Sequence, residues 1–418
     1  MLPKSATNMA YNLTGLIGFF ISLKLLRYSL VQDDVLNNSL WLLLGTAIPI
    51  LFCEVFFAKC YKNPSSGLNF SQAHPVDLSR LATKLLGLYA IFAGIAFIYF
   101  CFPEYHAEFY KPYYSLLQLT VPLLIFFAIP YFYILDRYMT KPEDAYYELG
   151  RALLWKRDFG KDNLQVFLAW LVKAFFLPLM FVYFTRDTQF LLNFQVDHIL
   201  SSFSNAFEFL FHFMFSLDLL FVSIGYMCTF RIFDSQIRST EPTFLGWGIA
   251  LVCYQPFWSF FSTNFLSYGS DKTWGYWLSG SPFYYVWGIC ILLLLAIYLW
   301  ATVAFGVRFS NLTHRGIITN GPYRFTKHPA YISKNLAWWM LSMPFMVSTN
   351  VQDSIRHSAL LLFLNLIYFL RAKTEERHLS QDPVYCRYAE YIRLHGVFAF
   401  RKKEAPLNLG DMMPEKNY

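Results

Sequence analysis

Long apolar runs recur along this chain from about residue 10 to residue 370, and they constrain its fold more than any other feature. A helix needs about 20 mostly apolar residues to cross a bilayer. Only 15% of the residues are charged, whereas soluble domains average about 25%. The sequence therefore predicts an all-α, polytopic membrane protein, and it disfavours a disordered chain, a collagen-like chain or an ordinary soluble enzyme.

The apolar runs predict about ten transmembrane helices, of which the last is short. The predicted spans cover approximately residues 10–30, 39–58, 83–102, 114–135, 164–184, 206–228, 243–262, 283–307, 329–348 and 357–371. With this arrangement, 26 of the 34 Lys and Arg residues lie on the side that holds both termini, and 6 lie on the other side. Because basic loops stay in the cytoplasm, we expect both termini to be cytoplasmic, in a bacterial inner membrane or the endoplasmic reticulum.

The net charge of +7 resides mainly in the loops between apolar runs. Topology and contact with lipid headgroups explain such basic loops without a nucleic-acid partner. The seven cysteines show no CxxC spacing, so neither a disulfide framework nor a zinc site is indicated. The expected partners are membrane lipids and a lipid or lipidated substrate; the sequence indicates no oligomeric state.

Several polar residues fall inside predicted spans, where ionisable groups are costly and often functional. Glu208 and His212 are four residues apart and share a helix face, and Asp218 follows on a neighbouring face. Gln255 precedes a proline that should kink the seventh span. These four residues either hold the bundle together or bind the polar head of a substrate. A metal site is disfavoured because only one histidine is present there.

The densest set of polar residues lies at 321–331, which reads GPYRFTKHPAY. Its Gly-Pro pair marks a turn. Its His-Pro pair opens an apolar run, and proline is tolerated in the first turn of a helix. A basic membrane anchor explains Arg324 and Lys327, but it does not explain Gly-Pro-Tyr and His-Pro together.

A second set follows the tenth span. Arg371 is followed by EERHL at residues 375–379, and then by DPVYCRYAEYI at residues 382–392. Adjacent carboxylates stabilise a helix start through the helix dipole, or they face a cationic ligand. The two stretches together resemble the isoprenylcysteine carboxyl methyltransferase and phospholipid methyltransferase superfamily, over about residues 283–400.

The resemblance implies a domain organisation. Residues 281–400 would form an isoprenylcysteine methyltransferase-like catalytic core, and residues 401–418 a cytoplasmic tail. Residues 1–280 match no family that we can name. They would form a helical membrane module of about seven spans that encloses the acceptor.

The resemblance also implies S-adenosylmethionine as the cofactor. The residues implied to bind it are Gly321, Tyr323, Lys327, His328, Pro329, Tyr331, Glu375 and Glu376. Arg371 matches an arginine that family members place at the reaction centre. A carboxylate or phosphate acceptor needs only a cation to orient it, which Arg371 or Arg324 provides. This chain departs from the family pattern at Lys327, where arginine is usual, and at Ser333 and Lys334.

The predicted function is an integral-membrane methyltransferase that depends on S-adenosylmethionine. It would act on a lipid carboxylate, phosphate or amine at the cytoplasmic face. One alternative is an NADPH-dependent reductase like the sterol reductases, which share an Arg-His-Pro-x-Tyr region. Another is a non-enzymatic membrane scaffold or transporter. Gly-Pro-Tyr at residues 321–323 and the pair Glu375 and Glu376 favour the methyltransferase.

Overall fold

A computed structural model of the chain describes residues 1–28, 34–264, 268, 272–346 and 350–399. Eight helices in these ranges are long and apolar enough to cross a membrane. They are α1 (Met9–Tyr28), α2 (Val35–Phe52, continued by the π-helical turn Cys53–Phe57), α3 (Leu78–Cys101), α4 (Lys111–Tyr138), α6 (Lys161–Asn193), α8 (Phe203–Met227), α12 (Phe283–Phe305) and α14 (Val351–Leu379). The prediction of an all-α polytopic membrane protein is confirmed.

Shorter elements connect these helices. They are α5 (Ala145–Leu153), α7 (Val196–Leu200), α9 (Phe244–Leu251), α10 (Phe257–Asn264), α11 (Trp274–Trp277), α13 (Pro329–Ser342), α15 (Pro383–His395) and the strands β1 (Ser239–Thr240) and β2 (Thr313–His314). The two strands pair antiparallel, with Ser239 opposite His314 and Thr240 opposite Thr313. This ribbon joins a loop of the N-terminal part of the chain to a loop after α12.

Two of the ten predicted spans are not single long helices. The segment 243–262 is divided into α9 and α10 around Pro256, whose ring cannot continue a helix and which lacks a backbone donor. The segment 329–348 contains only the 14 residues of α13. At 1.5 Å per residue, α13 is about 21 Å long, shorter than the roughly 30 Å hydrocarbon core. It ends where Met343 adopts a left-handed backbone just before Pro344.

Polar side chains at the first residues explain where several helices begin. Asp77 accepts hydrogen bonds from the backbone N–H groups of Ser79 and Arg80 at the start of α3. Asn350 and Asp382 cap α14 and α15 in the same way. Such caps satisfy the free N–H groups of the first turn. The start of α14 at Val351 makes it longer than the predicted tenth span, 357–371.

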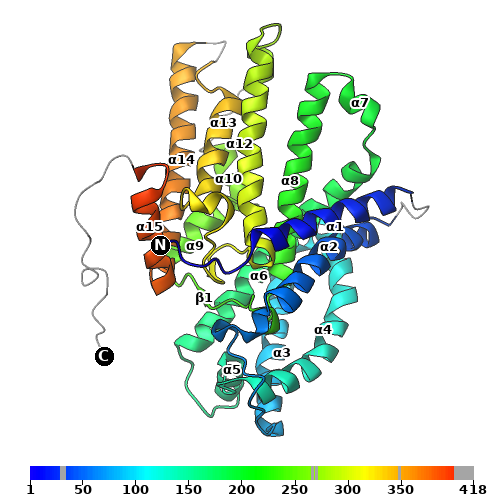
Figure 1. Ribbon diagram of the computed structural model, residues 1–418, viewed down its shortest axis with the longest axis vertical. Helices are drawn as coiled ribbons and strands as arrows, with labels where there is room; N and C mark the ends of the chain where they lie inside the picture. The colour runs from blue at the N-terminus through cyan, green and yellow to red at the C-terminus, as the bar shows by residue number, and fades with distance from the viewer. Residues whose placement is uncertain (29–33, 265–267, 269–271, 347–349, 400–418) are drawn as a thin grey trace.

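The helices are arranged in two regions, which Figure 1 shows in one view. In the upper half, α8, α12, α13 and α14 stand side by side, with α12 packed between α8 and α13. In the lower half, α5 packs on α3, and α4 lies beside them. Residues of α8, α12 and α13 line one of the two cavities described below, and residues of α12, α13 and α14 line the other.

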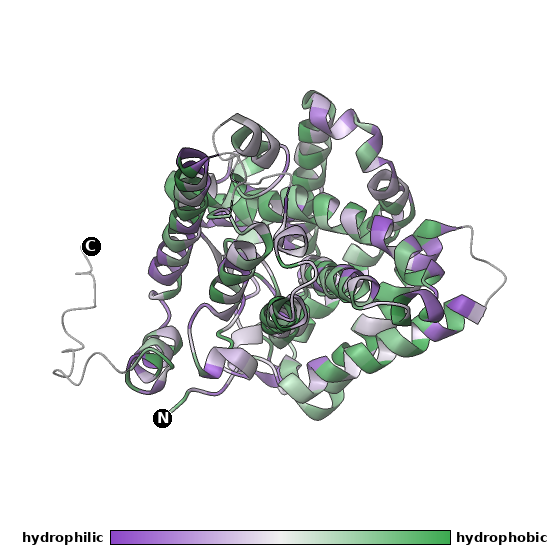
Figure 2. Cartoon of the chain, turned by 90° about the horizontal axis from the view of Figure 1, so that it is seen from above, coloured by the Kyte–Doolittle hydropathy of each residue, from purple (hydrophilic) through white to green (hydrophobic). Residues whose placement is uncertain are grey.

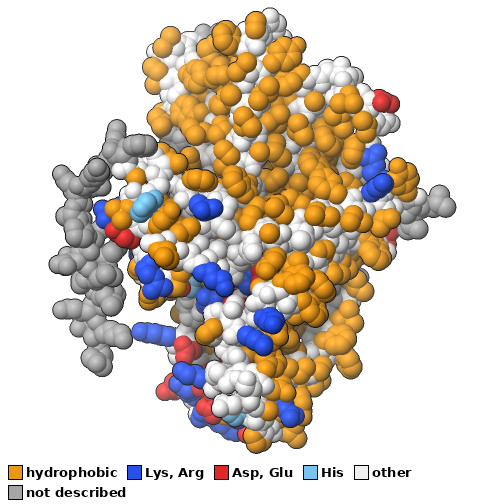
Figure 3. All heavy atoms as spheres, viewed as in Figure 1, with side chains coloured by type: hydrophobic (Ala, Val, Ile, Leu, Met, Phe, Trp, Pro, Cys, Tyr) orange, Lys and Arg blue, Asp and Glu red, His pale blue; other side chains and the backbone are white. Residues whose placement is uncertain are grey.

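The outside of the bundle is strongly apolar. Seen from above, hydrophobic residues predominate along most helices (Figure 2). On the face in Figure 3, hydrophobic side chains cover the upper and right parts, and charged side chains gather at the lower left. Only 11% of the most apolar stretch of α4 is buried, so its Leu and Phe side chains suit contact with lipid rather than with water.

The loops at the charged end are tied together by buried polar contacts. Arg315 is buried, and its guanidinium donates to five backbone carbonyls, at Gly225, Cys228, Ser235, Val307 and Phe309. A single side chain thereby fixes the loop after α8 against the loop after α12. These contacts position the polar residues of the candidate site.

Candidate active site

The Gly-Pro-Tyr turn, Gly321–Arg324, packs against α12. Gly321 has a φ of +54°, and a Cβ there would come 3.1 Å from Nε1 of Trp300. Both the backbone conformation and the close packing therefore favour glycine at this position. Tyr388 of α15 donates its hydroxyl to the carbonyl of Tyr323 at 2.8 Å. Burial raises the pKa of Tyr323 well above its ordinary value, so this phenol stays neutral. The α15 motif thus holds the turn in place.

Two hydrogen bonds join the first turns of α13 to α14. Nε2 of His328 lies 2.9 Å from Oε1 of Glu376, and the hydroxyl of Tyr331 donates to Oε2 of Glu375 at 2.9 Å. The rings of His328 and Tyr331 stack on each other, 5.5 Å apart. The two halves of the sequence motif, more than 40 residues apart, therefore form one site.

The two adjacent carboxylates have different surroundings. Glu376 pairs with Lys327 at 2.6 Å and with Lys373 at 3.1 Å, besides its contact with His328. Glu375 accepts only the Tyr331 hydroxyl and has no ion pair within the described ranges. Glu376 is therefore neutralised by its neighbours, whereas Glu375 keeps a negative charge that a cationic ligand can meet.

Arg371 lies one helical turn before Glu375 and is 8% exposed. Its Nη2 donates to Oδ1 of Asn311 at 2.6 Å, and Asn311 in turn donates to the hydroxyl of Tyr226. The guanidinium also lies 5.5 Å from the ring centre of Tyr254. No carboxylate pairs with Arg371 among the residues that the structure describes, so its charge is held in a fixed direction but is not neutralised.

These side chains surround a cavity, which we call the motif cavity. Its open volume is about 120 Å³, below the 300–1,000 Å³ that is usual for ligand pockets. A ligand of nucleoside size must therefore displace side chains at the rim. The predicted site residues that line the motif cavity are Tyr323, Lys327, His328, Tyr331, Arg371 and Glu375.

The other predicted motif residues do not line it. Gly321 and Pro329 shape the backbone, and Glu376 anchors His328 and Lys327. Arg324 is exposed and is absent from the cavity wall. Of the two arginines predicted to orient an acceptor, the structure therefore places only Arg371 at the cavity.

Lys334, one turn after Ala330 on α13, adds a third cation to the lining, besides Lys327 and Arg371. Its ammonium lies 5.3 Å from the ring centre of Tyr298 and 5.8 Å from that of Trp338. Asp218 does not line the cavity. It accepts hydrogen bonds from Tyr298 at 2.7 Å and from Thr302 at 2.5 Å, and both of these residues do line it. Asp218 thus positions part of the wall.

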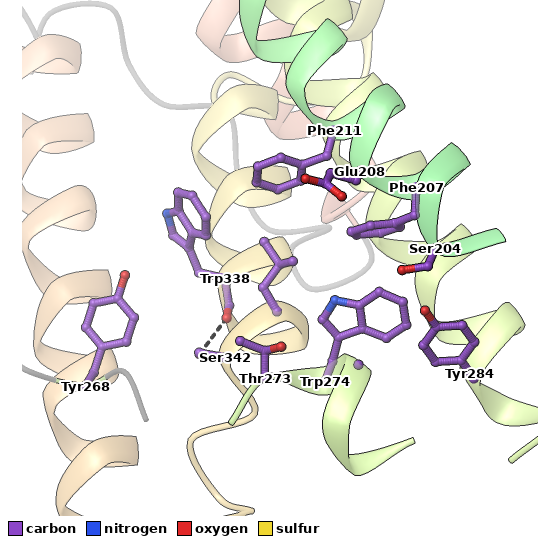
Figure 4. Close-up of a pocket in the computed structure, with 12 residues that line it drawn as sticks. Ser204, Phe207, Glu208, Phe211, Tyr268, Thr273, Trp274, Tyr284, Trp338 and Ser342 are labelled. Atoms are coloured by element: carbon purple, nitrogen blue, oxygen red, sulfur yellow. Dashed lines mark hydrogen bonds between the residues drawn. The ribbon is translucent and has the colours of Figure 1, made fainter. Parts of the chain in front are cut away.

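A second cavity, the aromatic chamber, lies farther along α13 (Figure 4). Its volume is about 470 Å³. Figure 4 shows Phe207, Glu208 and Phe211 of α8 on one side, with Trp338 of α13 across from them. The remaining lining residues are Ser204, Tyr268, Thr273, Trp274, Gly275, Tyr284, Leu341 and Ser342.

The four polar span residues thus have separate surroundings. Glu208 lines the chamber. His212 is exposed beside the rings of Phe190 and Phe211 and lines neither cavity. Gln255 accepts hydrogen bonds from the backbone and hydroxyl of Ser259 in the first turn of α10. The sequence left a structural role and a shared site for a polar head both open, and the structure does not bring these residues together at one site.

Several residues that line the motif cavity were not predicted from the sequence. His378 follows Glu375 by three residues, so helical spacing alone places it on the same face. Asn311, Tyr254 and Glu241 also line the cavity. They come from loops and from the break between α9 and α10, and no local pattern marks them.

A family comparison bears on this arrangement of Gly-Pro-Tyr, His-Pro and the paired glutamates. Residues 285–381 match the sequence model of the Isoprenylcysteine carboxyl methyltransferase (ICMT) family. The resemblance seen in the sequence motifs is thereby confirmed for this segment. No curated protein and no solved structure matches the chain.

The ICMT match extends from the start of α12 to the end of α14 and contains most of the motif-cavity wall. It supports a membrane methyltransferase of the isoprenylcysteine type. It leaves out most of the chain, including Tyr254 and Tyr226, which lie against Arg371 and Asn311. Residues outside the ICMT segment thus help to position the arginine inside it.

Proposed function

We propose that this protein is an integral-membrane methyltransferase that transfers a methyl group from S-adenosylmethionine to an anionic lipid acceptor. One observation carries the proposal. Glu375 and Arg371 lie one turn apart on α14, line the same cavity, and form no ion pair with each other or with other described residues. Glu375 can therefore pair with a cationic group of the cofactor, and Arg371 with an anionic group of the acceptor.

The residues present fit this cofactor by charge. Bound S-adenosylmethionine supplies an electrophilic methyl group: the acceptor oxygen gains a bond to carbon as the sulfur–carbon bond breaks, giving a methyl ester and a neutral thioether. Glu375 would face the cationic end of the cofactor, and Tyr331 fixes the direction of that carboxylate. Lys327 and His328 already contact the carboxylate of Glu376. They would therefore line the rim of the cofactor site and would not pair with a charged group of the cofactor.

The acceptor end of the cavity is cationic. Arg371 and Lys334 both line it, and a positioned cation holds a carboxylate or phosphate oxygen in line for attack. Such an acceptor needs no general base, whereas an amine must first lose a proton. Rings of Tyr254, Tyr298 and Tyr368 exclude water around these charges.

The aromatic chamber would take the acceptor's apolar tail. Trp338 lines the chamber, and Lys334, one turn earlier on α13, lines the motif cavity. From Lys334 to Leu341, α13 rises about 10 Å. An acid head at Lys334 and a tail directed toward Leu341 would therefore lie along the same helix. Residues 1–280 contribute Phe207 and Phe211 to this chamber, which supports the predicted role of this module.

The experiment uses the purified full chain in lipid nanodiscs. Calorimetry with S-adenosylmethionine and with NADPH separates the methyltransferase from a reductase. Binding of the first alone supports the proposal, and binding of NADPH alone overturns it. Transfer of a radiolabelled methyl group into a base-labile lipid ester then identifies an acid acceptor. Transfer into a base-stable lipid amine contradicts the acceptor class.

A further inference from the structure

One edge of the motif cavity carries polar atoms that the proposed transfer does not use. This edge is formed by the β1–β2 ribbon and the last turn of α14. Glu241 directly follows β1, Thr313 lies in β2, and His378 projects from α14; all three line the cavity. Glu241 lies outside the ICMT segment.

His378 has a buried ring nitrogen without a partner. The side chain is 6% exposed, and Nε2 lies 3.2 Å from Oγ of Ser239. Nδ1 makes no hydrogen bond within the described part of the chain. The nearest carboxylate oxygen, Oε2 of Glu241, is 4.0 Å away, which is too far for a hydrogen bond. Because an unsatisfied buried polar atom is costly, a ligand group at Nδ1 would be favourable.

Glu241 has one anchored oxygen and one free oxygen. Oε1 accepts hydrogen bonds from the backbone N–H of Thr243, from the hydroxyl of the same residue and from Arg377. Oε2 accepts no hydrogen bond from the described residues. The carboxylate is therefore fixed in direction by one oxygen, and the other remains able to accept a donor.

Thr313 completes the edge. Its Oγ1 is buried and also lacks a partner in the described ranges. The edge thus offers a carboxylate acceptor, an imidazole nitrogen and a hydroxyl around one place. Two neighbouring hydroxyl groups, each able to donate and accept, match such a set.

The short distance between Glu375 and His378 indicates which part of a ligand would supply these two hydroxyl groups. Glu375 and His378 are three residues apart on α14, so their Cβ atoms lie about 5–6 Å apart. In S-adenosylmethionine the ribose is bonded through its 5′ carbon to the cationic sulfur. A ligand whose cationic centre faces Glu375 therefore brings its ribose diol close to His378.

We infer that Glu241, Thr313 and His378 form a subsite for the ribose diol of the cofactor's nucleoside. The inference rests on the proposed function. It also gives residues 1–280 a second role. Their side chains in the aromatic chamber would bind the acceptor, and the loop that carries Glu241 would bind the cofactor.

The test is calorimetry of the full chain in nanodiscs with S-adenosylhomocysteine and with its 2′-deoxy and 3′-deoxy forms. The wild type should bind at least one deoxy form about tenfold or more weakly, since a hydrogen bond to a charged group is lost. Glu241→Gln and Thr313→Val should each bind S-adenosylhomocysteine more weakly and discriminate less between it and that deoxy form. Thr313→Val keeps the side chain's shape and removes only the hydroxyl.

Glu108→Gln is the matched control, because it makes the same substitution at an exposed carboxylate that does not line the motif cavity. It should keep the discrimination against the deoxy form. If the wild type binds S-adenosylhomocysteine but treats all three ligands alike, the ribose subsite is refuted and the proposed function stands. If the wild type binds none of them, the proposed function itself fails.

Discussion

Glu54 and Arg308, 254 residues apart in the sequence, form a buried two-point ion pair. Nη1 of Arg308 lies 2.9 Å from Oε1 of Glu54, and Nη2 lies 3.2 Å from Oε2. Both side chains are nearly inaccessible to solvent. The hydroxyl of Thr7 also donates to Glu54. The pair connects the π-helical end of α2 to the short 3-10 turn Gly306–Arg308 that follows α12, and thus connects a helix outside the ICMT segment to a turn inside it.

Replacement of Glu54 by Gln should destabilise the protein by about 3–5 kcal/mol, because the buried charge of Arg308 loses its counter-charge and keeps only backbone carbonyls as partners. Thermal unfolding in detergent would measure the loss. Replacing the exposed Lys156 by Gln serves as the control and should change stability little. An unchanged melting temperature for Glu54→Gln would mean that the pair carries no net stability.

The sequence motifs predicted six of the residues that line the motif cavity, because Tyr323, His328, Tyr331 and Glu375, for example, lie in two short stretches with regular spacing. They did not predict Asn311, which holds Arg371, because that contact joins a loop to a helix 60 residues later. Such tertiary contacts leave no local pattern.

The apolar runs predicted about ten spans, of which eight are long helices in the described ranges and two are not, because hydropathy measures composition and not backbone continuity. Pro256 divides one segment, and a left-handed Met343 before Pro344 ends the other. Of the two alternatives for Glu208, His212 and Asp218, the structure does not form the shared polar site, for a related reason. Helical spacing fixes which face a residue is on, but not which neighbour packs against that face.

The topology prediction concerns the sides of the membrane. Most Lys and Arg residues lie in loops that would share one side with both termini, so that side should be cytoplasmic. Single cysteines introduced at Lys156 and at Ser201, both exposed in loops, should be labelled from opposite sides of sealed vesicles. Labelling of both from the same side would contradict the arrangement.

Acid should weaken the protein through His314. Burial lowers the pKa of His314 to about 4, despite the nearby carboxylate of Asp382. In the unfolded chain the pKa is about 6.5. Between these values the unfolded state binds the proton and the folded state does not, so stability falls as pH drops from about 6.5 through 4. The contribution of this histidine is on the order of 3 kcal/mol.

Thermal unfolding from pH 7.5 to pH 4.5 would measure this effect. Other groups titrate in the same range, so the difference between wild type and His314→Gln isolates the histidine. The variant should lose less stability on acidification than the wild type. Parallel pH curves for the two proteins would show that His314 keeps an ordinary pKa.

The aromatic chamber should set the length of the acceptor's tail. Leu341→Trp fills part of the 470 Å³ volume, so kcat/KM should fall for long-chain acceptors and stay nearly constant for short ones. Glu208→Gln should also alter acceptor KM, since Glu208 lines the chamber, whereas His212→Ala should not. Cofactor affinity measured by calorimetry should be unchanged in all three variants. Equal losses for long and short acceptors would place the tail elsewhere.

The two neighbouring glutamates should respond differently to the same substitution. Glu375→Gln removes the free charge of the cavity and keeps the side chain's size, so S-adenosylmethionine binding should weaken by about 1–3 kcal/mol with little change in melting temperature. Glu376→Gln instead leaves Lys327, Lys373 and His328 without their shared carboxylate. This variant should lose stability, and its cofactor affinity should fall less than that of Glu375→Gln. Calorimetry and thermal unfolding on both variants separate the two roles. The assignment is wrong if Glu376→Gln weakens cofactor binding more than Glu375→Gln in samples of equal stability.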